Sequence, residues 1–438
     1  MSPYATEIAI IGVIALIVLI FAGMNIGMAL LTVGFIGYAS CLNWNWKAAF
    51  GVLRTVPSTQ AGSYSTLVVP LFVLMGNFAY RAGLSSGLYQ TGTKWLSRVP
   101  GSLACGTVAA GAGFGAICGS NTATCATMCT IALPEMRKAG YNDQLSTGSI
   151  AIGGTLGILI PPSTPMILYA IMASCSVGSL FEAGILPGIM MATLSIITIV
   201  ILCKINPDFA PSTQKCTWNE RIKTLPGLIP VVLLFGIVMG GIFTGWFSVT
   251  QSAAVGAFVA MLLMALPKNL TIRTIIDALR ECTRTFSMTF FIIIGASVFG
   301  NFLAITKMPM SLANLITGAN INRYVVIVLI TLIYLFLGMI MDELPMIMLT
   351  VPIFLPVIQA LGFDKIWFGI YIIMAMELGA LSPPVGLNCF IINGIQKDIS
   401  LATIYKGVLP FILTIFVAIA LITAFPIIVT YLPTVLNQ

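Results

Sequence analysis

The sequence predicts an all-α polytopic membrane protein with two related halves, and three observations support this prediction. Of the 438 residues, 58% are hydrophobic and only 8% are charged, with a mean hydropathy of +1.05, which exceeds what a water-soluble core of this size can bury. No charged residue lies between Glu7 and Lys47 or between Arg98 and Glu135, and each stretch can hold a membrane-spanning helix of roughly 20 residues. Several landmarks also recur at one fixed offset, which indicates an internal repeat.

The first apolar stretch is expected to be a retained span. The opening segment, MSPYATE, carries no basic residue, and no small-residue cleavage site follows it, which argues against a secretory signal peptide. The net charge of +7 is read as basic residues between spans, which is a topology signal and not a nucleic-acid footprint. Because an acidic N-terminus precedes a basic first loop, we expect the N-terminus to face the periplasm or exterior.

The residue types that carry most metal and hydrolytic chemistry are missing or poorly spaced. The chain has no histidine, and its ten cysteines form no CxxC pair, so we expect no transition-metal site. No P-loop is present, so ATP is not expected to drive the protein. An intramembrane enzyme is therefore disfavoured.

The internal repeat has an offset of 222 positions, which is the separation of Pro134 from Pro356 and of Gly140 from Gly362. The same offset relates Leu156, Gly157, Pro161 and Pro162 to Leu378, Gly379, Pro383 and Pro384. We expect a first repeat over 1–205, a polar linker over 206–224 and a second repeat over 225–438. Inverted halves are favoured over parallel ones.

Three amphipathic segments, 44–60, 84–99 and 268–284, contain too many charges to span the lipid. We expect them to lie along the membrane interface. The alternative is that they are ordinary connecting loops.

A polar run interrupts the uncharged stretch 99–134 of the first half. Residues 119–130 read GSNTATCATMCT and follow a glycine-rich segment. A single Ser or Thr in a membrane helix often bonds only to its own backbone, but a cluster of five such side chains favours a binding role. We expect a helix break followed by a half-helix with Ser120 or Asn121 at its N-cap.

A second break is predicted from Gly153, Gly154 and Thr155 into Pro161 and Pro162. Consecutive prolines cannot continue a helix, and the residue before them favours extended geometry. Broken backbone at membrane depth is tolerated only where it is buried in protein or lines a cavity, which is where transporters bind ions and solutes.

The second half repeats both breaks with acidic residues. Asp342 occupies the repeat position of Ser120, and Glu377 that of Thr155. A carboxylate near the bilayer centre costs about 2.5 to 3.5 kcal/mol unless it has a partner, so we expect a bound cation. Oxygen ligands suit Na⁺, with a proton carried by Asp342 or Glu377 as the alternative. A loop at the interface is a further alternative, more so for Glu343 than for Asp342.

Four blocks of this sequence resemble the large membrane subunit of tripartite ATP-independent periplasmic (TRAP) transporters. They read GSNTATCATMCTIALPEMRKAGY, GGTLGILIPPSTPMILY, GMIMDELPMIMLTVPIFLPVIQALGFD and ELGALSPPVGLN. The likeness extends over essentially the whole chain, with one departure, because members often carry two serines where this chain has Ser120 and Asn121.

The resemblance implies a sodium-coupled importer of organic acids in the bacterial inner membrane, supplied by a periplasmic substrate-binding protein. It also implies a small membrane (Q) subunit, expected here as a separate chain, and an elevator arrangement of a scaffold and a moving transport domain. By position, hairpin one would include 119–134 and hairpin two 342–356. No cofactor other than Na⁺ and no nucleic acid is expected.

The combined hypothesis assigns two sets of residues. The ion-binding residues are Gly119, Ser120, Asn121, Thr122, Gly154, Thr155, Gly338, Asp342, Thr350 and Glu377. The helix breaks that complete the substrate and ion sites are Thr124, Pro161, Pro162, Gly379, Pro383 and Pro384.

Two transport alternatives stay open on the sequence alone. One is a stand-alone ion-coupled anion carrier or cation antiporter on a similar repeat fold, and the other is a channel. The cargo is a carboxylate such as sialic acid or a C4-dicarboxylate, and the sequence does not separate the two.

Overall fold

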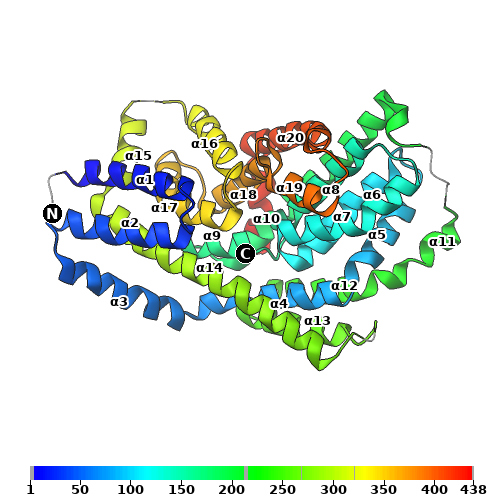
Figure 1. The fold of residues 1–438 in the computed structure, drawn as a ribbon, viewed down its shortest axis with the longest axis horizontal. Coiled ribbons are helices and arrows are strands. Elements are labelled where there is room, and N and C mark those ends of the chain that lie inside the picture. The colour runs from blue at the N-terminus through cyan, green and yellow to red at the C-terminus, as the bar shows by residue number, and fades with distance from the viewer. Residues whose placement is uncertain (1–3, 212–215, 268, 320, 437–438) are drawn as a thin grey trace.

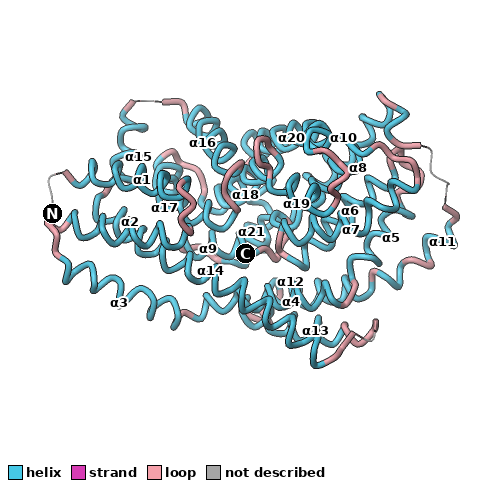
Figure 2. Tube along the Cα trace, viewed as in Figure 1, coloured by secondary structure: helices cyan, strands magenta, loops and turns pink. Residues whose placement is uncertain are grey.

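The computed structural model describes residues 4–211, 216–267, 269–319 and 321–436, and every regular element within these ranges is a helix (Figures 1 and 2). Four helices are long and apolar enough to cross a membrane, and the number rises to 7 if each of three bent helix pairs counts as one span. The prediction of an all-α membrane protein with broken helices is confirmed.

The first half contains the elements that precede the polar linker. They are α1 (Ala5–Phe21), α2 (Ile26–Cys41), α3 (Trp46–Gly62), η1 (Tyr64–Leu67), α4 (Val68–Arg81), α5 (Leu84–Trp95), α6 (Ser102–Cys118), α7 (Asn121–Lys138), α8 (Asp143–Leu159), α9 (Thr164–Met172) and α10 (Val177–Ile205).

The linker region 206–224 contains η2 (Pro207–Phe209) and α11 (Trp218–Ile222), whereas 212–215 lie outside the described residues. The elements that follow are η3 (Leu225–Gly227), α12 (Ile229–Phe243), α13 (Val249–Leu263), α14 (Ile272–Thr306), α15 (Met308–Gly318), α16 (Arg323–Gly338), α17 (Glu343–Ala360), α18 (Lys365–Leu381), α19 (Leu387–Ile395), α20 (Leu401–Ala424) and α21 (Ile427–Leu436).

The helices of the second half follow those of the first at the sequence offset. α12 and α13 correspond to α1 and α2, α15 to α5, and α16–α20 to α6–α10. The agreement is exact for two pairs, α7 with α17 and α8 with α18, because in each pair both the first and the last residues are 222 positions apart. The repeat seen in the sequence is therefore a repeat of helices.

One element differs between the halves. In the first half, α3 and the η1–α4 segment meet at a bend of 60°, whereas α14 is one continuous helix of 35 residues. Ser63 lies in the extended region at this bend, and Pro70 lacks the N–H that would carry the helical ladder into α4. The matching positions in α14 are Thr285 and Ile292, which continue the helix. The amphipathic segment 268–284 is thus mostly the first part of a long helix, and Lys268 itself lies outside the described residues.

The two halves interlock. α2 packs on α14 of the other half and α13 packs on α4, while α7 packs on α19 and α17 on α9. Figure 1 shows α9, α10 and α18 in the middle of the molecule, with α1–α3 at one end and α5, α6 and α11 at the other. Small residues permit the closest crossings: a Cβ on Gly115 would lie 2.4 Å from Gly157 Cα, and one on Gly338 would lie 2.8 Å from Gly379 Cα.

Both proline pairs end a helix as predicted. α8 ends before Ile160 and the chain resumes as α9 with a bend of 41°, and the matching break separates α18 from α19 at Pro383 and Pro384. The sequence predicted that the break at Pro161 and Pro162 begins as early as 153–155. This prediction is wrong, because α8 stays helical through Leu159. The glycines there serve packing instead, since a Cβ on Gly154 would lie 2.7 Å from Cys125 Cβ.

Candidate functional site

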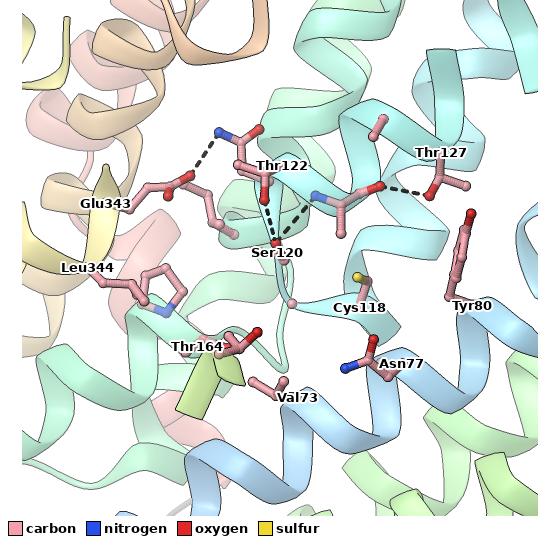
Figure 3. A pocket seen from close by; sticks show the side chains of 18 of the residues that line it. Val73, Asn77, Tyr80, Cys118, Ser120, Thr122, Thr127, Thr164, Glu343 and Leu344 are labelled. Carbon is pink, nitrogen blue, oxygen red and sulfur yellow. Dashed lines mark hydrogen bonds between the residues drawn. The ribbon is translucent and has the colours of Figure 1, made fainter. Parts of the chain in front are cut away.

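The turn between α6 and α7 places a helix N-terminus inside the protein. Gly119 has φ +62°, a conformation that favours glycine, and a Cβ there would lie 2.9 Å from the carbonyl oxygen of Pro162. Ser120 is the N-cap of α7 as predicted, because its Oγ accepts a hydrogen bond from Ala123 N at 3.4 Å. The same Oγ lies 3.2 Å from Thr122 Oγ1 (Figure 3), so two hydroxyl groups meet at this helix tip.

Asn121 joins the two halves through its side chain. Asn121 Nδ2 donates to Glu343 Oε1 at 2.8 Å, and Asn388 Nδ2 donates to Asn121 Oδ1 at 2.7 Å and to Ala151 O at 2.9 Å. Asn121 and Glu343 are 222 residues apart, so equivalent positions of the two repeats face each other. The network connects α7, α17, α19 and α8. Asn121 and Glu343 are both buried, with 1% and 7% of their surfaces exposed, respectively.

A second pair of equivalent positions meets between α8 and α18. Glu377 is fully buried and interacts with Thr155, its counterpart in the first repeat. Neither carboxyl oxygen of Glu377 has a hydrogen-bond partner among the described residues, and the Thr155 hydroxyl donates to Ile152 O at 2.9 Å. A buried carboxyl group without a donor is a strong candidate for a cation or proton site.

The tip of α17 adds a third acidic group. Asp342 is the N-cap residue of α17, but its side chain makes no capping hydrogen bond. Its Oδ1 is buried without a partner among the described residues, and so is Ser163 Oγ in the break between α8 and α9. The N–H of Thr164 donates to the carbonyl of Gly119 at 3.4 Å, which ties this break to the α7 tip.

A cavity of about 430 Å³ lies against both helix tips (Figure 3). Its walls come from α4, α7, α14 and the start of α17, with single positions of α6 and α8 and the start of α9. Hydroxyl and amide side chains dominate the polar part of the lining: Asn77, Tyr80, Ser120, Asn121, Thr122, Thr127, Thr130, Thr164, Thr285 and Thr289. Three carboxylic acids also line it, Glu281, Asp342 and Glu343, whereas no Lys or Arg is found among the described lining residues.

The predicted ion-binding residues separate into groups. Gly119, Ser120, Asn121, Thr122 and Asp342 line the cavity. Thr155, Glu377 and Gly154 lie in the packed core between the broken helices, where the described lining does not extend.

Three further predicted residues have structural partners of their own. The Thr350 hydroxyl donates to Met346 O at 2.7 Å and also bonds to the Tyr334 hydroxyl. Gly338 packs on Gly379. Thr124 Oγ1 donates to Ser120 O at 2.7 Å and so supports the α7 tip from one turn below.

Sequence reasoning missed or discounted some residues of the site. Glu343 is buried and hydrogen-bonded, so a loop at the interface does not describe it. Asn388, which links Asn121 to α8, and Ser163 were not singled out, although both directly follow a proline-containing break. Glu281 lines the cavity from α14, and only the amphipathic pattern of its helix could have drawn attention to it.

Paired broken helices, repeated hydrogen-bonding tips and a polar cavity between them define this chain as a multi-pass membrane transporter. The model of the DctM component of the tripartite ATP-independent periplasmic transporter matches residues 13–428. The chain therefore belongs to this family and is a large membrane subunit of a TRAP transporter, as the sequence blocks indicated.

Curated relatives agree along nearly the whole chain. The sialic acid TRAP transporter large permease protein SiaM of Vibrio cholerae is 30% identical over 418 residues, which covers 95% of this chain and 96% of the relative. The C4-dicarboxylate TRAP transporter large permease protein DctM of Pseudomonas aeruginosa is 31% identical over 373 residues and 85% of each chain. These relatives are permease subunits and not enzymes, so this chain is a transporter subunit as well.

Two solved transporter structures share the fold. The YdaH transporter of Alcanivorax borkumensis superposes with a TM-score of 0.64 at 14% identity, covering 86% of this chain and 90% of that one. MtrF of Neisseria gonorrhoeae gives a TM-score of 0.62 at 16% identity, covering 97% and 95%. At these identities the likeness concerns the fold alone.

Proposed function

We propose that this chain imports an organic acid together with Na⁺, as the large membrane subunit of a complex that receives its cargo from a periplasmic binding protein. Membership in the family supports a transporter that works with a small membrane subunit and a binding protein. Coupling to sodium and the nature of the cargo are inferences from the site.

The observation that carries the sodium proposal is the set of unpartnered oxygen atoms at the helix breaks and in the core beside them. Asp342 Oδ1, both oxygens of Glu377 and Ser163 Oγ are buried without hydrogen-bond partners among the described residues. Buried polar groups of this kind are rare in folded proteins unless something else satisfies them. A hard cation held by oxygens fits such groups, and neither sulfur nor imidazole is needed.

The cavity residues are the better candidates for one ion. Ser120, Thr122 and Asp342 would contribute side-chain oxygens, with Gly119 and Asn121 at the same tip. Thr155 and Glu377 would hold a second cation, with Gly154 beside them, or Glu377 would carry a proton. In either case the bound cation would offset the charge of acidic groups that face an anionic cargo.

The cargo proposal rests on the polarity of the cavity. The N-termini of α7 and α17 both border the cavity, and helix N-termini favour negative charge. An organic acid such as sialic acid or a C4-dicarboxylate would be accepted in this cavity after the cation has organised the tips. The many hydroxyl groups of the lining would suit a hydroxylated acid better than a plain diacid, because such a cargo can satisfy them.

Movement of the loaded site completes the proposed cycle. The two halves would be inverted in the inner membrane, and the α6–α7 and α16–α17 hairpins would travel with the broken helices past a scaffold. The separate small membrane subunit would belong to that scaffold. α4 and α14 of the cavity wall pack on each other, and α13 and α2 pack on them in turn. This packing supports a division between a supporting frame and a moving core.

The test is uptake into proteoliposomes that contain the complete complex and its binding protein. Radiolabelled N-acetylneuraminate and succinate are supplied under an inward Na⁺ gradient, an inward K⁺ gradient or a pH gradient. We expect accumulation of one of the two acids only with the Na⁺ gradient. Accumulation driven equally well by a pH gradient without Na⁺, or uptake that needs no binding protein, would contradict the proposal.

A further inference from the structure

The cavity lacks a basic side chain of its own although its proposed cargo is an anion. Its described lining contains three carboxylic acids and no Lys or Arg. One of the three, Glu281, bonds to a guanidinium at the edge of the cavity, because Arg81 Nη2 donates to Glu281 Oε2 at 3.0 Å. Arg81 is the last residue of α4, the helix that also provides Asn77 and Tyr80 to the cavity wall.

The contact between Arg81 and Glu281 uses only part of the guanidinium. One N–H group bonds to one carboxylate oxygen, while Arg81 Nε is buried and has no partner among the described residues. Arg137 in the same chain shows the saturated arrangement, with Nε and Nη2 on Asp143 and Nη1 on Asp398. Arg221 likewise keeps a buried Nε without a partner among the described residues while its Nη2 donates to Ser97 Oγ at 3.2 Å, so the distinguishing feature of Arg81 is its bond to a carboxylate that lines the cavity.

The partner of Arg81 is easily displaced. The Glu281 side chain is 57% exposed, whereas that of Arg81 is 24% exposed, so Glu281 can return to water at little cost. The backbone end of Arg81 is held independently, because Asn269 Nδ2 donates to Arg81 O at 3.1 Å. The backbone at Arg81 is thus held whether or not Glu281 stays bound.

We propose that Arg81 receives the carboxylate of the cargo and that Glu281 occupies its place until the cargo arrives. The incoming carboxylate takes the Nη2 that Glu281 now holds, and it reaches the buried Nε once Glu281 has turned away, which completes the bidentate pairing that guanidinium and carboxylate favour. Glu281 then turns toward solvent. A neutral compound cannot displace Glu281, so the exchange selects for an anion. The inference rests on the proposed function, in which the cargo is an organic acid.

The test compares the two halves of the ion pair in the complete reconstituted complex. The KM for uptake of N-acetylneuraminate or succinate, whichever the wild type accumulates under a Na⁺ gradient, is measured for Arg81→Gln, Arg81→Lys and Glu281→Gln. We expect Arg81→Gln to raise KM by about ten-fold or more, the effect of losing a hydrogen-bonded charge. The KM of Arg81→Lys falls between those of the wild type and Arg81→Gln, because lysine keeps the charge without the planar guanidinium. Glu281→Gln lowers KM, because a neutral side chain competes less with the cargo for Arg81.

A purely structural ion pair makes a different prediction. Arg81→Gln and Glu281→Gln break the same contact, so they would then lower uptake and thermal stability alike. Equal effects of the two variants, or a wild-type KM in Arg81→Gln, would overturn the assignment. Lys138→Gln is the matched control, because it breaks the exposed Lys138–Glu135 pair and is expected to leave KM unchanged. If Arg81→Gln does not fold, the contrast between Arg81→Lys and Glu281→Gln decides.

Failure of the inference is distinguishable from failure of the proposed function. A wild type that accumulates neither acid under a Na⁺ gradient contradicts the proposed function itself. A wild type that accumulates one of them, with a KM insensitive to Arg81, contradicts only the role of Arg81.

Discussion

Replacing Asn121 by Ala removes the link between the two helix tips, and the structure sets the size of the effect. Asn121 is the donor to the buried Glu343 carboxyl group at 2.8 Å and the acceptor for Asn388. Asn388 keeps its bond to Ala151 O, so the larger loss is at Glu343. Leaving a buried acceptor without its donor costs about 1 to 3 kcal/mol, and losing the hydrogen bond from Asn388 adds about 0.5 to 1.5 kcal/mol. We therefore expect Asn121→Ala to lower the free energy of unfolding by about 2 to 4 kcal/mol.

The assay is denaturant unfolding in mixed micelles, followed by tryptophan fluorescence in K⁺ buffer so that no Na⁺ binding contributes. Thr130→Ala is the control, because the Thr130 hydroxyl lines the same cavity but bonds only to Ala126 O of its own helix. That change is expected to stay within about 0.5 kcal/mol. A double-mutant cycle with Glu343→Ala isolates the pair, and a coupling energy below about 0.5 kcal/mol would refute the reasoning.

Three further predictions follow from neighbouring features. Asp342→Asn should abolish Na⁺-driven uptake in proteoliposomes while the thermal unfolding of the purified protein stays near that of the wild type; unchanged uptake would remove Asp342 from the ion site. Gly119→Ala should lower the free energy of unfolding by about 1 to 2 kcal/mol, because alanine is strained in the left-handed backbone conformation. Its Cβ would also approach Pro162 O and displace the tip of α7, so uptake by this variant measures whether the α7 tip must stay in place. The guanidinium of Arg137 lowers the pKa of Asp398. Their pairing therefore stabilises the protein at pH values above the ordinary Asp pKa of about 3.9, and this stabilisation is lost as the pH falls through the lowered pKa. The stability advantage of the wild type over Arg137→Gln should shrink in that acidic range, and a difference independent of pH would contradict the pairing.

Local chemistry made the helix breaks predictable. Consecutive prolines end a helix, so Pro161 and Pro383 predicted the breaks. Ser120 and Asn121 after a glycine-rich segment predicted the N-cap of α7. The repeat was also visible, because both copies must form the same helices from similar residues. These features depend on neighbours in the chain.

Features that depend on packing could not be read in the same way. Gly153 and Gly154 resemble a helix break in the sequence, yet in the protein they let α6 and α7 approach α8. The partners of Asn121, which are 222 and 267 residues away, are chosen by how the two halves interlock. Glu343 is buried for the same reason, and the pairing of Arg81 with Glu281 across 200 residues has no local signal at all.

Equilibrium binding of radioactive sodium to the purified subunit addresses most directly whether the unpartnered oxygens at the helix breaks hold a cation. The wild type should bind Na⁺ saturably in the presence of K⁺ at equal ionic strength, and Asp342→Asn should lose at least one bound ion. A wild type that binds no Na⁺, or an Asp342→Asn variant that binds the same amount with the same affinity, would contradict the account.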